Sequence, residues 1–306
     1  MLQLLLELVP CLLGGLWLGH LRPDLPERLA PVLLRWGVPI SLVGLLLKGG
    51  LNGDTLQAAM FSLLITSGGL MVTLGVPQLR DLLPVRSLQL GAVVGNTAYF
   101  GLPVALALLP PAALSFSITY DLVGTLVTWS IGPVLLNGHW EQPKQLLRRL
   151  LMTPVCQSVL IATPLLLSPW STTIAALLWW PARVVLWLML GLVGMRLGLL
   201  LIHTDGKPLL RPGQLMPALV IKLVLLPAFT LLVGRVLSWP ALMRDALVLQ
   251  AGAPTAMSVL LLAEASQQKS RESIPAAQLV LWSTVMALVS VPLWWWVAMV
   301  GPRSTA

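Results

Sequence analysis

Polar and helix-breaking residues interrupt an otherwise apolar segment, GAVVGNTAYFGLPV, at positions 91–104. Asn96 and Thr97 bring side-chain hydrogen-bonding groups, whereas Gly101 and Pro103 weaken a helical backbone. A proline inside a helix removes one donor and displaces the carbonyl four residues earlier, so a new half-helix begins there with unpaired N–H groups. Such N–H groups carry partial positive charge and attract anions. The segment therefore predicts an anion site that needs no fixed cation.

A second segment, QAGAPTAMSV at positions 250–259, has the same character. Its Pro254 follows a glycine by two residues, as Pro103 does in the first segment. In lipid, broken backbone is tolerated only against protein or a wet cavity, so we expect the two breaks to meet. The amides expected to lack partners are those of Val104, Ala105 and Leu106 in one half-helix and of Thr255, Ala256 and Met257 in the other. The expected substrate-binding residues are Asn96, Thr97, Gly101, Pro103, Val104, Gln250, Gly252, Pro254 and Thr255.

Two ionisable residues lie inside apolar segments and are candidates for coupling or gating. Asp121 is too deep for a short carboxylate to reach water, so it needs a partner, a cavity or a proton. Its alternative role is a structural hydrogen bond to Asn96 or Thr125. Lys222 has a side chain long enough to reach the membrane surface. Otherwise it would replace a bound metal cation or pair with Asp121.

The composition indicates an integral membrane protein. The chain has 306 residues, of which 57% are hydrophobic and 10% are charged, with a mean hydropathy of +0.88. About a quarter of the residues of a soluble domain are charged, so a soluble chain this apolar could not cover its surface with polar groups. The net charge of +8 could suggest a nucleic-acid partner, but the basic residues are scattered singly among loops. The histidines and the two cysteines lack the spacing of a metal or redox site, so we expect no metal and no cofactor.

Apolar runs separated by Pro, Gly and charged residues predict an all-α polytopic protein of the cell membrane. The ten expected transmembrane helices cover residues 2–20, 31–48, 55–76, 87–109, 113–136, 150–168, 181–201, 214–237, 243–264 and 275–299. The loops after odd-numbered helices hold eleven of the 19 Lys and Arg residues, and the other loops hold five. The positive-inside rule therefore places the odd-numbered loops in the cytoplasm and both termini outside.

Features of the first half of the chain recur in the second half at a nearly constant spacing. The recurring pairs are Cys11 with Cys156, Pro103 with Pro254, and Pro133 with Pro292. These pairs also match the helix order, and a second copy of a five-helix unit must insert upside down because five is odd. We therefore expect one transmembrane domain over 1–306, with repeats at about 1–140 and 147–306, as in many secondary transporters.

The chain resembles the auxin efflux carrier family. The segment GNTAYFGLPV and the Tyr-Asp of SFSITYDLVGTLVTW are similar to the fourth and fifth helices of that family. The segments VIKLVLLPAFTLLV, AGAPTAMSVLLLAEA and AAQLVLWSTVMALVSVPLWWW are similar to its last three helices. The resemblance extends over the whole chain and is strongest over 91–136 and 216–296. Because the chain lacks a long cytoplasmic loop, it is similar to the short prokaryotic members.

The resemblance implies ten helices in two inverted five-helix repeats, with the fourth and ninth helices broken and crossing. It implies transport of an organic anion, such as auxin, malate or malonate. Asn96 and the crossing around Pro103 and Pro254 would line the substrate site. The first, second, sixth and seventh helices would form a scaffold and a possible homodimer contact.

Three other functions are open. A sodium-coupled importer of the bile-acid symporter type shares this fold but needs oxygen ligands at the second break, where Gln250 and Thr255 occur without an acidic residue. An integral membrane enzyme acting on lipids needs paired acids, a metal constellation or a Ser/His arrangement at one membrane face, and we find none. A sensor that binds the anion without moving it would show binding but no flux.

Overall fold

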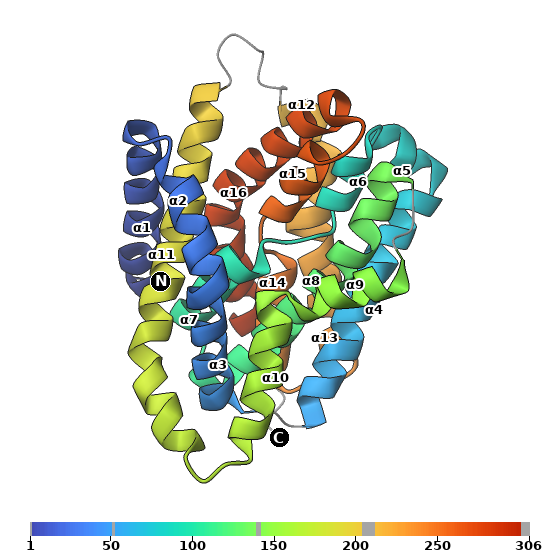
Figure 1. Ribbon diagram of the computed structural model, residues 1–306. Coiled ribbons are helices and arrows are strands. Elements are labelled where there is room, and N and C mark those ends of the chain that lie inside the picture. The colour runs from blue at the N-terminus through green and yellow to red at the C-terminus, as the bar shows by residue number, and fades with distance from the viewer. Residues whose placement is uncertain (1, 51–52, 139–141, 204–211, 301–306) are drawn as a thin grey trace.

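The computed structural model describes residues 2–50, 53–138, 142–203 and 212–300, and these residues fold into helices joined by short connections (Figure 1). The first half contains α1 (Leu2–Leu21), α2 (Leu25–Val32), η1 (Leu33–Gly37), α3 (Val38–Gly49), α4 (Gly53–Gly75), α5 (Pro77–Leu82), α6 (Arg86–Gly91), η2 (Thr97–Gly101), α7 (Leu102–Leu108), η3 (Pro111–Ala113) and α8 (Leu114–Asn137). The second half contains α9 (Pro143–Leu151), α10 (Pro154–Leu166), α11 (Ser171–His203), α12 (Pro212–Val220), η4 (Ile221–Leu225), α13 (Leu226–Val236), α14 (Ala241–Ala251), α15 (Met257–Glu264) and α16 (Lys269–Val300).

Six helical segments are long and apolar enough to cross a membrane. They are Leu25–Gly49, Gly53–Gly75, Pro111–Asn137, Ser171–Leu199, Gln214–Val236 and Lys269–Met299. The pair α9 and α10 would add a seventh as one span bent by 65°, and shorter apolar helices occupy Val9–Leu21 and Thr97–Leu108. The protein is therefore a multi-pass, all-helical membrane protein, as the composition predicts.

Each of the ten ranges expected to be transmembrane helices contains helical residues, but three of them are not one uninterrupted helix. The ranges 87–109 and 243–264 are each divided by a non-helical stretch. The range 150–168 is shortened because Thr153 caps a new helix, α10, and accepts a hydrogen bond of 3.4 Å from the Cys156 N–H. Proline at 154 fits the first turn of this helix, where its missing N–H costs nothing.

Close backbone packing joins α1 to α11 along one side of the molecule (Figure 1). A Cβ atom on Gly15 or Gly19 would overlap the carbonyl oxygens of Gly191 and Met195 on α11. Small residues let two membrane helices approach this closely and replace the hydrophobic driving force that lipid does not provide. The glycines of α1 therefore fix the contact between these two helices.

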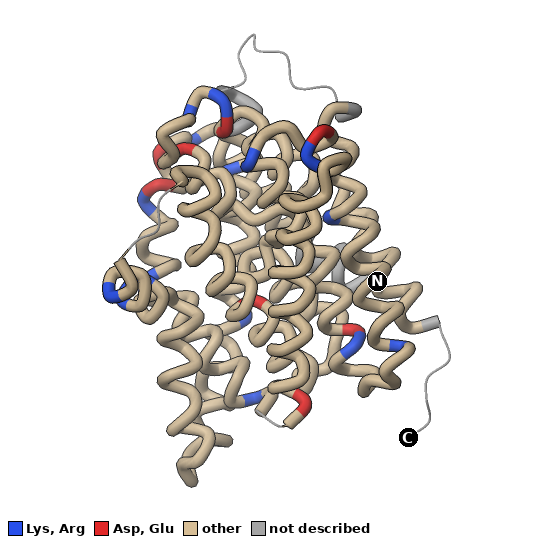
Figure 2. The backbone as a smooth tube through the Cα atoms, turned by 90° about the vertical axis from the view of Figure 1, so that its right-hand side faces the viewer, with Lys and Arg blue, Asp and Glu red and all other residues tan. Residues whose placement is uncertain are grey.

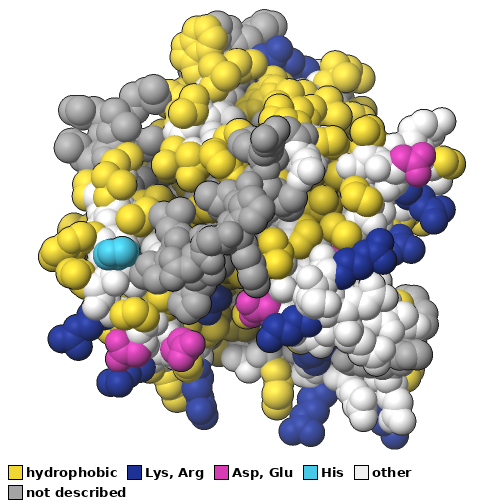
Figure 3. Space-filling view, turned by 90° about the horizontal axis from the view of Figure 1, so that it is seen from above, with side chains coloured by type: hydrophobic (Ala, Val, Ile, Leu, Met, Phe, Trp, Pro, Cys, Tyr) yellow, Lys and Arg dark blue, Asp and Glu magenta, His cyan; other side chains and the backbone are white. Residues whose placement is uncertain are grey.

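The charged residues are unevenly distributed along the bundle (Figure 2). Lys and Arg are more numerous toward the end that carries the α5–α6 and α15–α16 connections (Figure 2), and they occupy much of its rim when that end is viewed directly (Figure 3). Lys207, Arg211 and Arg303 are among the basic residues from which the orientation is predicted; they lie outside the described residues, as do Met1 and residues 301–306.

Candidate functional site

Two segments of the chain are broken, and the breaks cross each other. The first break lies between α6, which ends at Gly91, and η2; the second lies between α14 and α15. Gly95 and Thr255 form an antiparallel bridge at the crossing. The Asn96 N–H donates to the Pro254 oxygen at 2.6 Å, and the Ala256 N–H donates to the Val94 oxygen at 3.1 Å. Each break therefore supplies hydrogen-bond partners to the backbone groups of the other. Lipid could not supply such partners.

The position of the first break differs from the expectation. The non-helical stretch covers residues 92–96, and Pro103 lies in the first turn of α7, within the continuous helix Thr97–Leu108. A π-helical turn precedes this proline, and the Asn96 oxygen accepts from both the Phe100 N–H and the Gly101 N–H. The wider π-helical turn accommodates the proline inside the helix, so Pro103 does not break it. The predicted unpaired amides at 104–106 are therefore wrong.

The unpaired amides lie elsewhere in the two half-helices. In the described part of the chain, the N–H groups of Thr97, Ala98 and Tyr99 make no hydrogen bond, and neither do those of Met257 and Ser258. The expectation holds for Met257 but is wrong for the two residues before it. The Thr255 N–H donates to Ser283 Oγ at 3.0 Å, and the Ala256 N–H is used in the crossing. The free positive ends therefore begin at 97 and 257.

Side-chain donors cap the opposite, carbonyl ends of the broken helices. Thr255 Oγ1 donates to the Gly91 oxygen at 2.9 Å, at the end of α6. Lys222 Nζ donates to the Ala251 oxygen at 2.7 Å, at the end of α14. A cation at a helix carboxyl end is favourable because it offsets the negative end of the helix dipole. The Thr255 cap joins the second break to the first, and the Lys222 cap joins η4 to the end of α14.

Lys222 is fully buried beside the crossing and does not reach the membrane surface. Its Nζ atom would lie 2.9 Å from a Cβ atom on Gly95, so the glycine leaves room for the ammonium group. No ion pair joins Lys222 to Asp121, although the structure describes both residues. The snorkelling interpretation and the pairing of these two residues are therefore wrong.

A cavity of about 790 Å³ opens on the unpaired amides. All five residues that carry these amides line it, together with Asn96 and Asp121. The remaining walls come from α8, α9, α10, α11 and the start of α3. The other expected binding residues lie outside the lining of the cavity: Gly101, Pro103, Val104, Gln250, Gly252, Pro254 and Thr255. The expected coupling residue Lys222 also lies outside this lining.

Asp121 is held against the first half-helix. Thr97 Oγ1 donates to Asp121 Oδ1 at 2.5 Å, so the predicted partners Asn96 and Thr125 are wrong. Asp121 Oδ2 and Asn96 Nδ2 are buried without a partner among the described residues. Because both residues line the cavity, one acceptor and one donor are available to a bound molecule.

Gln250 packs behind the first half-helix. It is fully buried, and a Cβ atom on Gly101 would overlap its Oε1 atom. Gly101 is therefore required because the Gln250 amide approaches it closely. Its role is to make room for this side chain and not to weaken the helix.

Three arginines that were not predicted as site residues line the cavity: Arg148, Arg149 and Arg196. The Arg149 guanidinium lies 5.9 Å from the ring centroid of Trp129 and donates to the Trp129 oxygen. Only Arg196 gave a signal, because it falls inside the expected span 181–201, and ionisable residues within membrane spans commonly face a cavity. What the sequence lacked was the 65° bend that turns α9 across the bundle (Figure 1).

These features define a class of protein. Several apolar helices surround a cavity at the crossing of two broken helices, and three arginines and the unpaired amides lie in its otherwise largely apolar wall. This is the arrangement of a membrane transport protein. The family described as "Membrane transport protein" matches residues 139–295, just over half of the chain. The chain belongs to this family, the auxin efflux carrier family. A comparison with curated protein sequences gives no match.

Proposed function

We propose that this protein is a secondary carrier that moves a small organic anion by alternating access around the crossing. One observation carries the proposal: five unpaired amides from two half-helices line the same cavity as three arginines. Helix amino ends and guanidinium groups both favour negative charge, and together they replace the hydration that an anion loses inside the membrane. The cavity of about 790 Å³ is large enough for a small carboxylate such as auxin, malate or malonate.

Asn96 and Thr97 are the proposed side-chain contacts of the substrate. Asn96 Nδ2 is a free donor at the cavity wall, and Thr97 links the wall to Asp121. Gly101, Pro103, Val104, Gln250, Gly252, Pro254 and Thr255 then act indirectly, by holding the two half-helices at the crossing. Asp121 is the proposed coupling or gating group, and Lys222 replaces a metal cation by supplying charge to the carboxyl end of α14.

Ten transmembrane helices in two inverted repeats, at about 1–140 and 147–306, are the proposed architecture of the single transmembrane domain. The antiparallel bridge supports this arrangement, because two half-helices of opposite direction then approach one point from opposite sides. The location in the cell membrane, with both termini outside, is part of the same proposal. So is a homodimer through α1, α2–α3, α10 and α11, which an oligomeric-state measurement in detergent would test.

The two alternatives have no supporting observation in the described residues. For a sodium-coupled importer, the second break would need oxygen ligands for a hard cation, but the Lys222 ammonium lies beside that break. For a lipid enzyme, the described residues contain no group of three or more His, Cys, Asp or Glu side chains that could hold a metal. We therefore retain the carrier as the proposed function.

Flux measurement tests the proposal. Purified protein in liposomes should exchange labelled malonate or indole-3-acetate against unlabelled anion, with the same rate in sodium and potassium buffers. Exchange that requires sodium would favour the importer. Binding without exchange would indicate a sensor, and absence of both binding and exchange across a panel of small carboxylates would contradict the proposal.

A further inference from the structure

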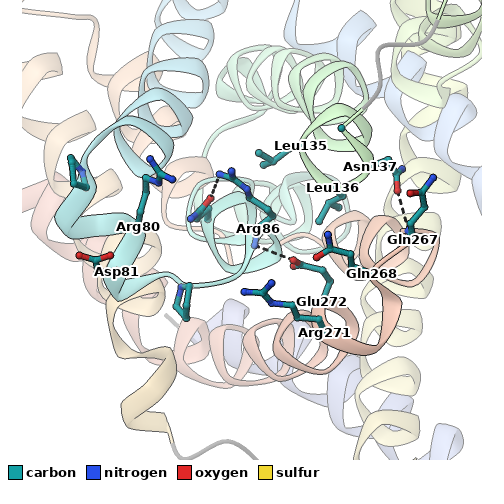
Figure 4. Close-up of a pocket in the computed structure, with 14 residues that line it drawn as sticks. Arg80, Asp81, Arg86, Leu135, Leu136, Asn137, Gln267, Gln268, Arg271 and Glu272 are labelled. Atoms are coloured by element: carbon teal, nitrogen blue, oxygen red, sulfur yellow. Dashed lines mark hydrogen bonds between the residues drawn. The ribbon is translucent and has the colours of Figure 1, made fainter.

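A second pocket lies at the end of the bundle that carries the α5–α6 and α15–α16 connections (Figure 4). Its volume is about 640 Å³, and its walls are α5, the start of α6, the end of α8 and the start of α16. It shares no lining residue with the crossing cavity. Arg80, Arg86 and Arg271 come to this pocket from three different helices (Figure 4).

Glu272 holds two of these helices together. Its carboxylate accepts hydrogen bonds from the Ser87 N–H at 2.7 Å and the Arg86 N–H at 3.3 Å, at the amino end of α6. Ser87 Oγ donates in return to the Glu272 oxygen at 3.0 Å. A buried carboxylate at a helix amino end is a strong cap, because it satisfies free amides and offsets the dipole. This joint fixes Arg271 beside Arg86.

The Arg86 side chain is also positioned in advance. Its Nη1 atom donates to Gln89 Oε1 at 2.9 Å, and Gln89 Nε2 donates to the Leu83 oxygen at 2.8 Å. Gln89 is only 3% exposed, so this amide is a rigid anchor. The remaining N–H donors of the guanidinium stay available at the pocket.

The charges of the pocket leave a net positive site. Its lining has three arginines and two carboxylates, Asp81 and Glu272, and the Glu272 carboxylate is already occupied by backbone amides. None of the three arginines forms an ion pair with any residue that the structure describes. Guanidinium groups that line one pocket match the several oxygens of a phosphate, which they bind through paired hydrogen bonds.

We propose that this pocket binds a phosphate group, either of an anionic phospholipid headgroup or of a small phosphate ester. A phosphate there contacts α5, α6 and α16 at once. It therefore links the outer ends of both broken segments, because α6 leads into the first break and α16 follows α15. This binding site is separate from the proposed substrate site and does not depend on the carrier function.

Thermal stability with inorganic phosphate provides the first test. The full-length protein in neutral detergent should gain melting temperature with phosphate, relative to chloride at the same ionic strength. The Arg86→Gln/Arg271→Gln variant should lose this gain, with an affinity about tenfold weaker for each guanidinium removed. Arg22→Gln, which removes an exposed arginine outside the pocket, should behave like the wild type. Since Arg86 lies at a helix joint, Arg80→Gln repeats the test with a residue that anchors no helix.

Native mass spectrometry separates the two sources of phosphate. If the ligand is a lipid, the wild type retains phosphatidylglycerol in preference to phosphatidylcholine and the double variant does not. If it is a free phosphate, only the thermal gain appears. The proposal is overturned if wild type and double variant bind phosphate and phosphatidylglycerol equally. It is also overturned if Asn96→Ala, rather than the arginine variants, removes the thermal gain, since phosphate would then occupy the crossing cavity.

Discussion

The backbone N–H of Asn96 donates a 2.6 Å hydrogen bond to the Pro254 oxygen, which joins two broken segments from opposite halves of the chain. This bond and its neighbour from Ala256 to Val94 use the groups that the breaks would otherwise leave unpaired. The amides of residues 97–99 and 257–258 remain free, and these residues line a cavity. The crossing is therefore both a structural joint and a source of positive potential inside the membrane.

The approach of Gln250 to Gly101 predicts a packing defect. Gly101→Ala places a Cβ atom against Gln250 Oε1, and overpacking of this kind lowers the free energy of unfolding by about 1–3 kcal/mol. Gly68→Ala is the control, because a Cβ atom there meets nothing within 4 Å. The measurement is the melting temperature in detergent. Adding Gln250→Ala should recover part of the loss, and simple addition of the two losses would contradict the assignment.

The hydrogen bond from Thr255 to Gly91 predicts a second stability difference. Thr255→Val removes the only donor in the described structure to the Gly91 oxygen, at nearly constant volume, and should cost about 1–3 kcal/mol. Thr230 is equally buried but donates to a carbonyl one turn earlier in its own helix. Thr230→Val should therefore cost clearly less. Equal losses, measured by chemical or thermal unfolding, would mean that the Thr255 cap does not hold the crossing.

We expect the substitution Asp121→Asn to impair transport without impairing folding. In Asp121→Asn, the amide oxygen still accepts from Thr97, while the charge facing the cavity disappears. We expect an unchanged melting temperature and an exchange rate reduced about tenfold, equivalent to about 1.4 kcal/mol. Asp24→Asn is the control, since Asp24 is exposed and its one ion pair within the described residues, with Arg28, is a contact of small energy.

Lys222→Gln complements this experiment, because an amide still donates to Ala251 but carries no charge. Normal exchange in both Asp121→Asn and Lys222→Gln would show that neither charge contributes to coupling or gating.

We expect the substitution Arg196→Gln to change the affinity of the cavity for anions. Arg196→Gln removes a guanidinium from the cavity wall and should weaken carboxylate binding about tenfold. Arg183→Gln is matched on the same helix, but Arg183 lies over the rings of Trp180 and Trp187, each at 5.5 Å, outside the cavity lining. Titration of the thermal shift with malonate gives both affinities. If Arg183→Gln weakens binding as much as Arg196→Gln does, the effect is not local to the cavity.

The sequence predicted the membrane class, the helix order and the crossing because these depend on composition and on Gly and Pro in apolar segments. Pro254 lies in its break as expected, whereas Pro103 lies inside the continuous helix Thr97–Leu108. The difference arises because the π-helical turn before Pro103 accommodates the proline, so the position of a proline alone does not locate the break. The break at 92–96 forms instead where the Val94 and Asn96 backbone finds partners across the crossing.

The candidate site was only partly accessible to sequence reasoning. Asp121 and Lys222 stand out as charges in apolar segments, but their partners depend on how distant helices pack. Arg148 and Arg196 look like ordinary residues near helix ends, and only the orientation of α9 and α11 directs them to the cavity. Helices that are apolar on all sides have no periodicity that reveals which face is turned inward.

Hydrogen–deuterium exchange of the backbone amides tests the central claim most directly. The ligand is the carboxylate that most stabilises the purified protein in a thermal screen. The account predicts that this anion slows exchange at residues 97–99 and 257–258, while amides at the distant Arg86–Glu272 joint keep their rates. Protection elsewhere, unchanged exchange at both half-helices, or the lack of any stabilising carboxylate would contradict it.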